Sequence, residues 1–367
     1  MAVAPRIAKL RETMATIGVN AFLISQPESR RYLSGFTGHD HPPMDSAGYL
    51  LITEARNLLL TDGRTVEQAE EEAPDYEVLR IEEKLAATLS QILPELGLSR
   101  IAFEGNHLTY RTFEELRGVV DPNAMLVPTY DVVDLQRASK DAEELEAIRA
   151  AVALADKAFT HILSIARPGI TERELAWEIE AFLRRHGSEG VSFDPIVASG
   201  PNASRPHHVP GDRPLQTGET IIIDWGARVN GYCSDITRTI VLGEADDRLK
   251  ELYKVVLDAQ TRAEERIRSG MVGRKADALA RKVIGAAGLG EQFVHSLGHG
   301  VGLAIHEAPR LSRTSEDVLE DGMVFSVEPG IYLPGWGGIR IEDLVTLQGG
   351  KPVVLTRSPK QLEAMEV

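Results

Sequence analysis

The sequence predicts an α+β protein of two domains, an N-terminal domain over residues 1–132 and a larger C-terminal domain over residues 133–367. Three observations predict this. A chain of 367 residues is longer than one hydrophobic core usually serves. Strand-like apolar runs alternate with helical periodicity in the first third. A segment of the later part recurs at an offset of 101 residues, as in a domain built from two related halves.

The N-terminal domain alternates helices with strands, which indicates an α/β sandwich. We expect helices up to Ile17, over 85–96 and over 110–119, and strands over 20–25, 48–52, 57–61 and 100–103. A stretch punctuated by Pro122 and Pro128 follows. Because a long charged helix begins at Asp141, we place the boundary between residues 130 and 140.

The repeat aligns residues 166–187 on residues 267–288 without gaps. A long helix precedes the first glycine in each copy and an amphipathic helix follows it. A strand-rich segment comes later in each half, over 219–242 and 323–347. This shared order favours a pseudo-twofold domain with a site between its halves over a chance similarity. The identical pairs are Arg167/Arg268, Gly169/Gly270, Arg173/Arg274 and Gly187/Gly288.

Composition narrows the function. A net charge of −15 without a Lys/Arg-rich block argues against a nucleic-acid or membrane partner. The single cysteine, Cys233, excludes a disulfide framework within one chain and favours a reducing compartment. The N-terminus predicts an amphipathic helix instead of a signal peptide, and no apolar run approaches the ~20 residues of a membrane span. We therefore expect a cytoplasmic protein with a small or peptide substrate.

Residues 219–242, ETIIIDWGARVNGYCSDITRTIVL, predict a β-hairpin with Asn230-Gly231 as its turn. This turn pairs 229 with 232 and 224 with 237, so Asp235 becomes the diagonal neighbour of Asp224 on one sheet face. Unpaired buried carboxylates are costly, so cations or strong donors must meet them. A solvated hairpin face is the alternative.

A second segment, GMVFSVEPGIYLPGWGGIRIEDLVTL at 322–347, repeats this logic. Glu328 ends an apolar strand just before Pro329-Gly330. Glu342 interrupts another apolar strand, and Arg340 shares its face two residues earlier. An Arg340–Glu342 ion pair without a metal is the alternative for this segment.

Between the hairpins lies HSLGHGVGLAIHE, residues 295–307. Its His299 is flanked by two glycines, which permit close backbone approach. A phosphate-binding loop is disfavoured because no Gly-Lys-Ser/Thr sequence or helix start follows. Together, the two segments and this histidine predict a set of metal ligands with four carboxylates and one imidazole. Such an oxygen-rich set suits Mn²⁺, Co²⁺ or Mg²⁺. Two such ions can polarise a carbonyl and generate an attacking hydroxide.

These motifs, with SGPNASRPHH, YLSGF and TDGR elsewhere, resemble the pita-bread metallopeptidases, most closely Xaa-Pro aminopeptidases and Xaa-Pro dipeptidases (prolidases). The resemblance covers most of the chain. It implies a C-terminal pita-bread domain preceded by a creatinase-like α/β domain. It also implies two divalent ions, Mn²⁺ foremost with Co²⁺ or Zn²⁺ as alternatives. The implied metal ligands are Asp224, Asp235, His299, Glu328 and Glu342.

The resemblance assigns further roles. Glu328 becomes the proton shuttle for a metal-bridging hydroxide that acts as the nucleophile. His207 matches the histidine that stabilises the transition state, with its neighbour His208 as the alternative. The implied catalytic residues are His207, His306, Glu328 and Arg340, and the implied substrate-binding residues are His207, His295, His306 and Arg340.

The implied activity is an exopeptidase that hydrolyses the Xaa-Pro bond at the N-terminus of peptides. The alternatives are a strict Xaa-Pro dipeptidase and a non-catalytic binding protein of the same fold. Creatine amidinohydrolase shares the fold but lacks the full ligand set. The resemblance further implies a homodimer.

Two features depart from the family pattern. Thr65 stands where family members often carry an aromatic residue. In the loop at 38–45, His39, Asp40 and His41 either reach a partner's active site or form a solvated loop, and we favour the solvated loop.

Overall fold

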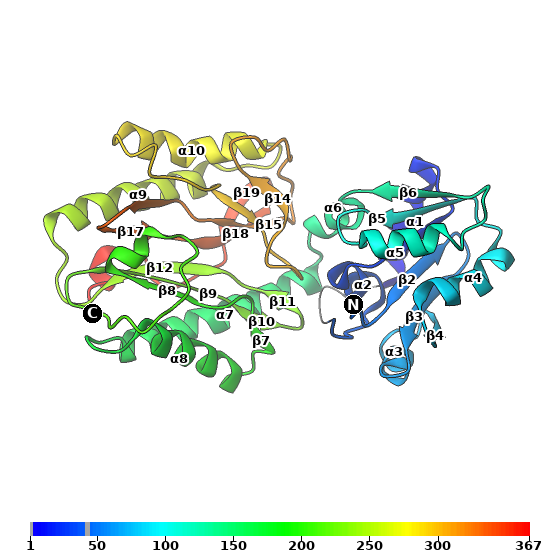
Figure 1. Ribbon diagram of the computed structural model, residues 1–367. Helices are drawn as coiled ribbons and strands as arrows, with labels where there is room; N and C mark the ends of the chain where they lie inside the picture. The colour runs from blue at the N-terminus through cyan, green and yellow to red at the C-terminus, as the bar shows by residue number, and fades with distance from the viewer. Residues whose placement is uncertain (1–2, 41–44) are drawn as a thin grey trace. The chain divides into compact units, whose positions relative to one another are not determined.

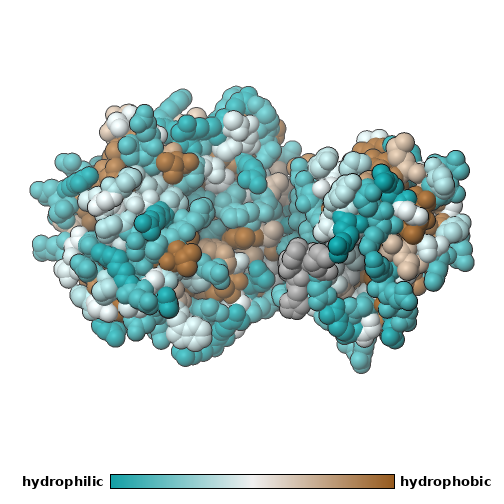
Figure 2. All heavy atoms as spheres, viewed as in Figure 1, coloured by the Kyte–Doolittle hydropathy of each residue, from teal (hydrophilic) through white to brown (hydrophobic). Residues whose placement is uncertain are grey.

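The computed structural model describes residues 3–40 and 45–367. They form two compact units, divided after Arg137. Figure 1 colours the N-terminal unit blue to cyan and the C-terminal unit green to red. On the face drawn in Figure 2, hydrophilic side chains cover most of each unit. Among the described residues, no helix is both long and apolar enough to cross a membrane.

The N-terminal unit is built on a six-stranded mixed sheet in the order β4-β3-β2-β1-β5-β6. Its inner strand β1 lies antiparallel to β2 and parallel to β5. The strands are β1 Ala21–Ile24, β2 Tyr49–Thr53, β3 Asn57–Asp62, β4 Glu77–Ile81, β5 Arg100–Glu104 and β6 Met125–Thr129. The helices are α1 Val3–Ile17, α2 Pro27–Ser34, α3 Val66–Glu72, α4 Leu85–Leu96, α5 Tyr110–Arg117 and α6 Val132–Ala138.

The sequence pattern predicts the inner elements of this unit and misses its edges. It predicts α1, α4 and α5 with strands β1, β2, β3 and β5, but not α2, α3, α6, β4 or β6. Every side chain of the edge strands β4 and β6 is exposed or half-buried. Neither strand therefore contains the apolar run that marks a buried strand.

The loop after α2 contains the Asp40 that we expected to be solvated. Its Oδ1 instead accepts hydrogen bonds from the Arg30 guanidinium at 2.8 Å and from the Ala47 N–H at 2.7 Å. The Arg30 side chain is buried. The expectation of a solvated loop therefore does not hold for Asp40, and His41 lies outside the described residues.

The C-terminal unit contains the predicted repeat. In the two halves, α7 Ala142–Ile165 corresponds to α9 Asp247–Arg266, and α8 Glu172–Arg185 corresponds to α10 Gly273–Ala286. The glycine between the helices has positive φ in both halves, +93° at Gly169 and +83° at Gly270. Gly169 donates its N–H to the Leu215 carbonyl at 3.0 Å, and Gly270 donates to the Leu319 carbonyl at 2.7 Å. These matched contacts confirm the pseudo-twofold organisation.

Strands from both halves form the layer between the helices. The first half supplies β7 Gly190–Val191, β8 Ile196–Ser199, β9 Thr220–Trp225, β10 Ala227–Val229, β11 Tyr232–Cys233 and β12 Ile236–Val241. The second supplies β13 Gly298–Gly300, β14 Glu307–Leu311, β15 Val324–Val327, β16 Gly330–Leu333, β17 Gly337–Arg340, β18 Asp343–Gln348 and β19 Lys351–Val354. They pair in the orders β12-β9-β8, β11-β10-β7, β14-β13-β15-β18-β19 and β16-β17.

Helices cover this strand layer on both sides. In Figure 1, α7 and α8 lie on one side and α9 and α10 on the other. Trp225 of β9 stacks on Phe159 of α7, with ring centroids 5.6 Å apart, and its Nε1–H donates to the Ala155 carbonyl at 3.1 Å. Truncating such a buried aromatic to alanine costs about 3–5 kcal/mol. This packing fixes β9 in place, and with it Asp224, the residue before Trp225.

Candidate metal centre

The first hairpin has the predicted register. Asn230 and Gly231 both have positive φ, +50° and +80°, as a two-residue type I′ turn requires. The strands pair from 229 with 232 to 224 with 237. Asp224 on β9 and Asp235, just before β12, are therefore diagonal neighbours.

A close approach at Gly226 interrupts this hairpin. A Cβ atom on Gly226 would lie 1.9 Å from the Ser234 carbonyl oxygen, so only glycine fits. The interruption leaves Asp235 between β11 and β12. Asp224 and Asp235 are both buried, at 9% and 5% exposed, as the predicted cation site requires.

The second acidic pair lies where strands end. Glu328 follows β15, and its Oε1 accepts from the Ser326 hydroxyl at 2.9 Å. Glu342 lies between β17 and β18. Its Oε2 accepts from the Thr237 hydroxyl at 2.6 Å, and its N–H donates to the Thr237 carbonyl at 3.1 Å. Glu342 of the second half is thus fixed to the hairpin of the first.

His299 lies on β13 among three of these acids. Its Nε2 is 3.6 Å from Asp235 Oδ2 and 3.3 Å from Glu328 Oε1. The flanking glycines are required, because a Cβ on Gly298 or Gly300 would lie within 2.0 Å of a neighbouring carbonyl oxygen. Asp235, His299 and Glu342 offer ligand atoms within 4.8 Å of one another.

The protonation of these groups reflects their crowding. Burial raises the pKa of Glu328 to about 7, with Asp224 adding to the rise and Arg340 opposing it. Burial and the neighbouring Glu342 and Asp224 carboxylates raise the pKa of Asp235 well above its ordinary value. Burial, followed by the nearby His306, lowers the pKa of His299 to about 3, so its imidazole is neutral at pH 7.

The donor set fits divalent cations. Asp224 Oδ1 and Glu342 Oε1 are buried and have no hydrogen-bond partner among the described residues. Several like-charged carboxylates and a neutral imidazole are costly to bury together unless a cation compensates them. Oxygen-rich ligands with one imidazole suit a divalent metal ion.

Arg340 brings a guanidinium cation into contact with one of these acids, Asp224. Its guanidinium donates to Asp224 Oδ2 at 2.6 Å and to the Tyr332 hydroxyl at 2.9 Å, and its Nε donates to the Thr237 hydroxyl at 3.1 Å. The residue is buried. Arg340 therefore pairs with Asp224, whereas the metal-free alternative placed it with Glu342.

A cavity of about 500 Å³ opens onto these residues. All of the predicted site residues line it. Two of the histidines are held in place: His295 Nε2 lies 2.9 Å from the Tyr332 hydroxyl, and the His306 ring packs edge-on against His299 with centroids 4.2 Å apart. The predicted residues along its wall are His207, His208, Asp224, Asp235, His295, His299, His306, Glu328, Arg340 and Glu342.

The neighbours His207 and His208 differ in their contacts. His208 is mostly buried and its Nε2 lies 2.8 Å from Glu172 Oε2. His207 is exposed in the cavity. Between the two alternatives, His207 is the one available to a substrate.

Sequence reasoning missed three residues of the site. Arg310 lines the same cavity as the predicted metal ligands, the Tyr332 hydroxyl accepts a hydrogen bond from Arg340, and Glu172 contacts His208. Tyr332 stands in the quoted SVEPGIY motif, so its position was a signal. Arg310 and Glu172 carry no local signal, because what places them is contact with residues distant in sequence.

Comparison with known proteins agrees with this geometry. Residues 146–348 match the model of metallopeptidase family M24, and residues 6–139 match the creatinase/prolidase N-terminal domain. The chain is 41% identical to an uncharacterised peptidase of Bacillus subtilis over 357 residues, 97% of this chain and 99% of that one.

Two solved structures are also similar. An Xaa-Pro dipeptidase from Bacillus anthracis superposes with a TM-score of 0.93 at 42% identity, covering 98% of this chain and 99% of that one. An X-Pro aminopeptidase from Thermotoga maritima gives 0.89 at 37% identity, covering 97% and 98%. The chain is therefore a member of metallopeptidase family M24, with a creatinase-like N-terminal domain followed in the sequence by a pita-bread C-terminal domain.

Proposed function

We propose that this chain is a dinuclear metallopeptidase that hydrolyses the Xaa–Pro bond of short peptides, with free dipeptides as its preferred substrates. The observation that carries the proposal is the convergence of four carboxylates, three of them buried and Glu328 half-buried, and a neutral imidazole on one cavity. The proposed metal ligands are Asp224, Asp235, His299, Glu328 and Glu342. When bound there, a pair of divalent ions supplies Lewis-acid polarisation of a carbonyl and lowers the pKa of water.

Glu328 is suited to move a proton during this reaction. In the metal-free fold, burial raises its pKa to about 7, so its carboxylate holds a proton more readily than an exposed glutamate does and is suited to accept one. The amide nitrogen of proline carries no hydrogen, and it must gain a proton to leave as an amine. Glu328 takes the proton from the attacking water and delivers it to this nitrogen.

The cavity histidines and Arg340 act on the substrate. His207, which faces the cavity, donates to the carbonyl oxygen as negative charge develops on it. His306, beside His299, borders the position of the proline ring. Arg340 holds Asp224 and Tyr332 in place through its hydrogen bonds.

The preference for dipeptides rests on Arg310. Its guanidinium lines the cavity, and among the described residues no side chain accepts a hydrogen bond from it. Its charge contributes, after burial, to the lowered pKa of His306. In an Xaa-Pro dipeptide the free carboxylate follows the proline directly, so an unpaired cation near His306 favours that substrate.

The second candidate is an Xaa-Pro aminopeptidase. The similarity to the X-Pro aminopeptidase of Thermotoga maritima, 37% identical with a TM-score of 0.89, favours it. The two candidates differ in whether the group after proline must be a carboxylate.

The test uses metal-stripped protein supplied with Mn²⁺ and compares kcat/KM for Ala-Pro with that for its C-terminal amide. A charge-assisted hydrogen bond contributes about 1.5–3 kcal/mol, so the dipeptide should be preferred roughly 10- to 100-fold. Arg310→Gln should abolish that preference. Arg313→Gln, at an exposed position three residues later, is the control.

Equal rates on the two substrates would point to the aminopeptidase. No hydrolysis of either by the Mn²⁺-loaded protein would refute the proposed function.

A further inference from the structure

Glu172 has a buried side chain that the chemistry above does not use. It lies in the first turn of α8 and is 0% exposed. It does not cap the helix, since Thr171 and Glu174 form the capping box there. A buried carboxylate without a role in capping needs other strong donors to offset its desolvation.

Five donors from one segment of chain supply that compensation. Oε1 accepts from the N–H and hydroxyl of Ser199, both at 2.8 Å, and from Asn202 Nδ2 at 3.0 Å. Oε2 accepts from His208 Nε2 at 2.8 Å and from the Gly211 N–H at 3.2 Å. Burial opposes ionisation, but the hydrogen bonds outweigh it and lower the pKa of Glu172. The carboxylate is therefore ionised and fully engaged near neutral pH.

All of these donors lie between residues 199 and 211, the segment that carries His207. His208 turns toward Glu172, whereas the adjacent His207 is exposed in the cavity. Because the two residues are adjacent, fixing the His208 imidazole also constrains the backbone that carries His207.

The other half of the repeat indicates that the fold itself does not need this carboxylate. The position equivalent to Glu172 is Gly273, where a Cβ would lie 2.2 Å from the Arg310 carbonyl oxygen. Both residues donate their backbone N–H across to the following loop, Glu172 to the Arg213 carbonyl at 3.1 Å and Gly273 to the Asp317 carbonyl at 2.8 Å. The backbone contacts recur, and the side-chain anchor belongs to the His207 half.

We propose that Glu172 is a positioning residue, which fixes the 199–211 segment so that His207 meets the substrate carbonyl in a productive orientation. The catalytic part of this inference rests on the proposed function. The anchoring part is independent of it.

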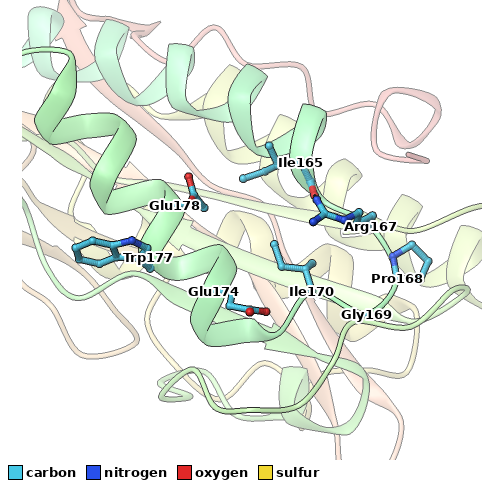
Figure 3. Close-up of a pocket in the computed structure, with 8 residues that line it drawn as sticks. All are labelled: Ile165, Arg167, Pro168, Gly169, Ile170, Glu174, Trp177 and Glu178. Atoms are coloured by element: carbon cyan, nitrogen blue, oxygen red, sulfur yellow. The ribbon is translucent and has the colours of Figure 1, made fainter.

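The first experiment compares Glu172→Gln with Glu174→Gln. Glutamine keeps the shape of the side chain, but its amide NH₂ faces donors where a carboxylate oxygen accepted hydrogen bonds. Glu174 is the matched control, because it belongs to the same helix turn and lines a separate cavity at the α7–α8 connection, as Figure 3 shows. We expect kcat for Ala-Pro to fall on the order of 10- to 100-fold in Glu172→Gln, with KM and Mn²⁺ content little changed. Glu174→Gln should keep the wild-type kcat.

A double-mutant cycle with His207→Ala separates positioning from general damage. If Glu172 acts through His207, adding Glu172→Gln to His207→Ala should lower kcat no further. Full additivity of the two losses would overturn the inference.

Hydrogen exchange measured by mass spectrometry tests the anchor without relying on activity. Amides of the 199–211 segment should exchange faster in Glu172→Gln than in the wild type or Glu174→Gln, with the rest of α8 unchanged. Unchanged exchange in this segment would contradict the inference even if activity fell. If the wild type does not cleave Ala-Pro, the proposed function is refuted. Faster exchange in Glu172→Gln would still support the anchoring role of Glu172 in that case.

Discussion

The two halves of the C-terminal unit share a scaffold but not a chemistry. Each places a long helix, a positive-φ glycine and an amphipathic helix against a strand layer. The first half contributes Asp224, Asp235, His207 and His208 to the cavity wall, and the second contributes the other predicted residues. The site residues do not occupy equivalent positions in the two halves. The repeat therefore supplies a symmetric scaffold, whereas the site itself is asymmetric.

The halves also differ in how they hold their histidine segments. In the first, Glu172 binds the loop directly. In the second, the buried Asp277 accepts from the Leu297 N–H at 3.0 Å and pairs with Arg281, which donates to the His295 carbonyl. An acid on the second helix of each half thus fixes a histidine-bearing segment, although the two acids occupy different positions in the repeat. Hydrogen bonds of this kind orient the site residues, and the local sequence does not predict them.

The largest expected effect is at Glu328, one of the two acids that the second half contributes to the site. Glu328→Gln should lower kcat about 10²- to 10⁴-fold, because it removes the carboxylate that we propose as the proton carrier. Circular dichroism and thermal unfolding should remain close to wild type. Glu316→Gln, at an exposed acid of the same half, is the control. A Glu328→Gln protein that turns over Xaa-Pro peptides at the wild-type rate would show that the mechanism is wrong.

Metal affinity should depend on pH through the same residue. The pKa of Glu328 is raised to about 7 in the metal-free fold, so a bound cation must displace its proton below that pH. Each unit below pH 7 should weaken Mn²⁺ binding about tenfold per displaced proton. The raised pKa means that the stability contributed by the protonated group is lost as pH rises through 7, so Mn²⁺ stabilises the fold most above pH 7.

Calorimetric titrations of stripped protein at pH 5 to 8 check this expectation. Proton release at pH 6 should come from carboxylates, because the pKa of His299 is about 3 and its imidazole is already neutral. Affinity that does not change between pH 5 and 7 would argue against a buried carboxylate ligand.

A smaller effect is expected at the second-half anchor. Asp277→Asn weakens the pairing with Arg281 and loosens the segment that carries His295. We expect kcat/KM for Ala-Pro to fall about tenfold, with faster amide exchange over residues 293–297. Faster exchange in the 199–211 segment instead would mean that the two halves are not supported independently.

The smallest effect tests the symmetry of the scaffold. Gly169 and Gly270 have positive φ, and the space that a Cβ atom would enter at each is open, so alanine meets only backbone strain there. Each substitution should lower the free energy of unfolding by about 1–2 kcal/mol, and by similar amounts. Urea unfolding measures both. A large difference between them, or a change in kcat, would show that the two turns are not equivalent.

Sequence predicts the parts of this molecule that local pattern determines. The Asn230-Gly231 turn sets the register of its hairpin, so the placing of Asp224 beside Asp235 follows from spacing alone. The repeat places its helices correctly, because Gly169 and Gly270, which lie between the two helices of each half, have the same backbone requirement.

The remainder depends on contacts between distant segments. The bond from Thr237 to Glu342 joins the halves across about a hundred residues of chain, and no local pattern encodes it. By its local sequence, Glu342 is as compatible with an ion pair to Arg340 as with a metal. Glu172 has the sequence context of an ordinary helix-start acid, and only the fold brings the loop that it binds beside it.

The central claim, that the two halves converge on a pair of divalent ions, is tested most directly by counting them. Metal analysis of the purified chain, followed by chelation and calorimetric titration with Mn²⁺, gives the number bound. We expect about two ions per chain, fewer in Asp235→Asn, and hydrolysis of Ala-Pro that disappears on chelation and returns with Mn²⁺. Hydrolysis that survives complete removal of metal would contradict it.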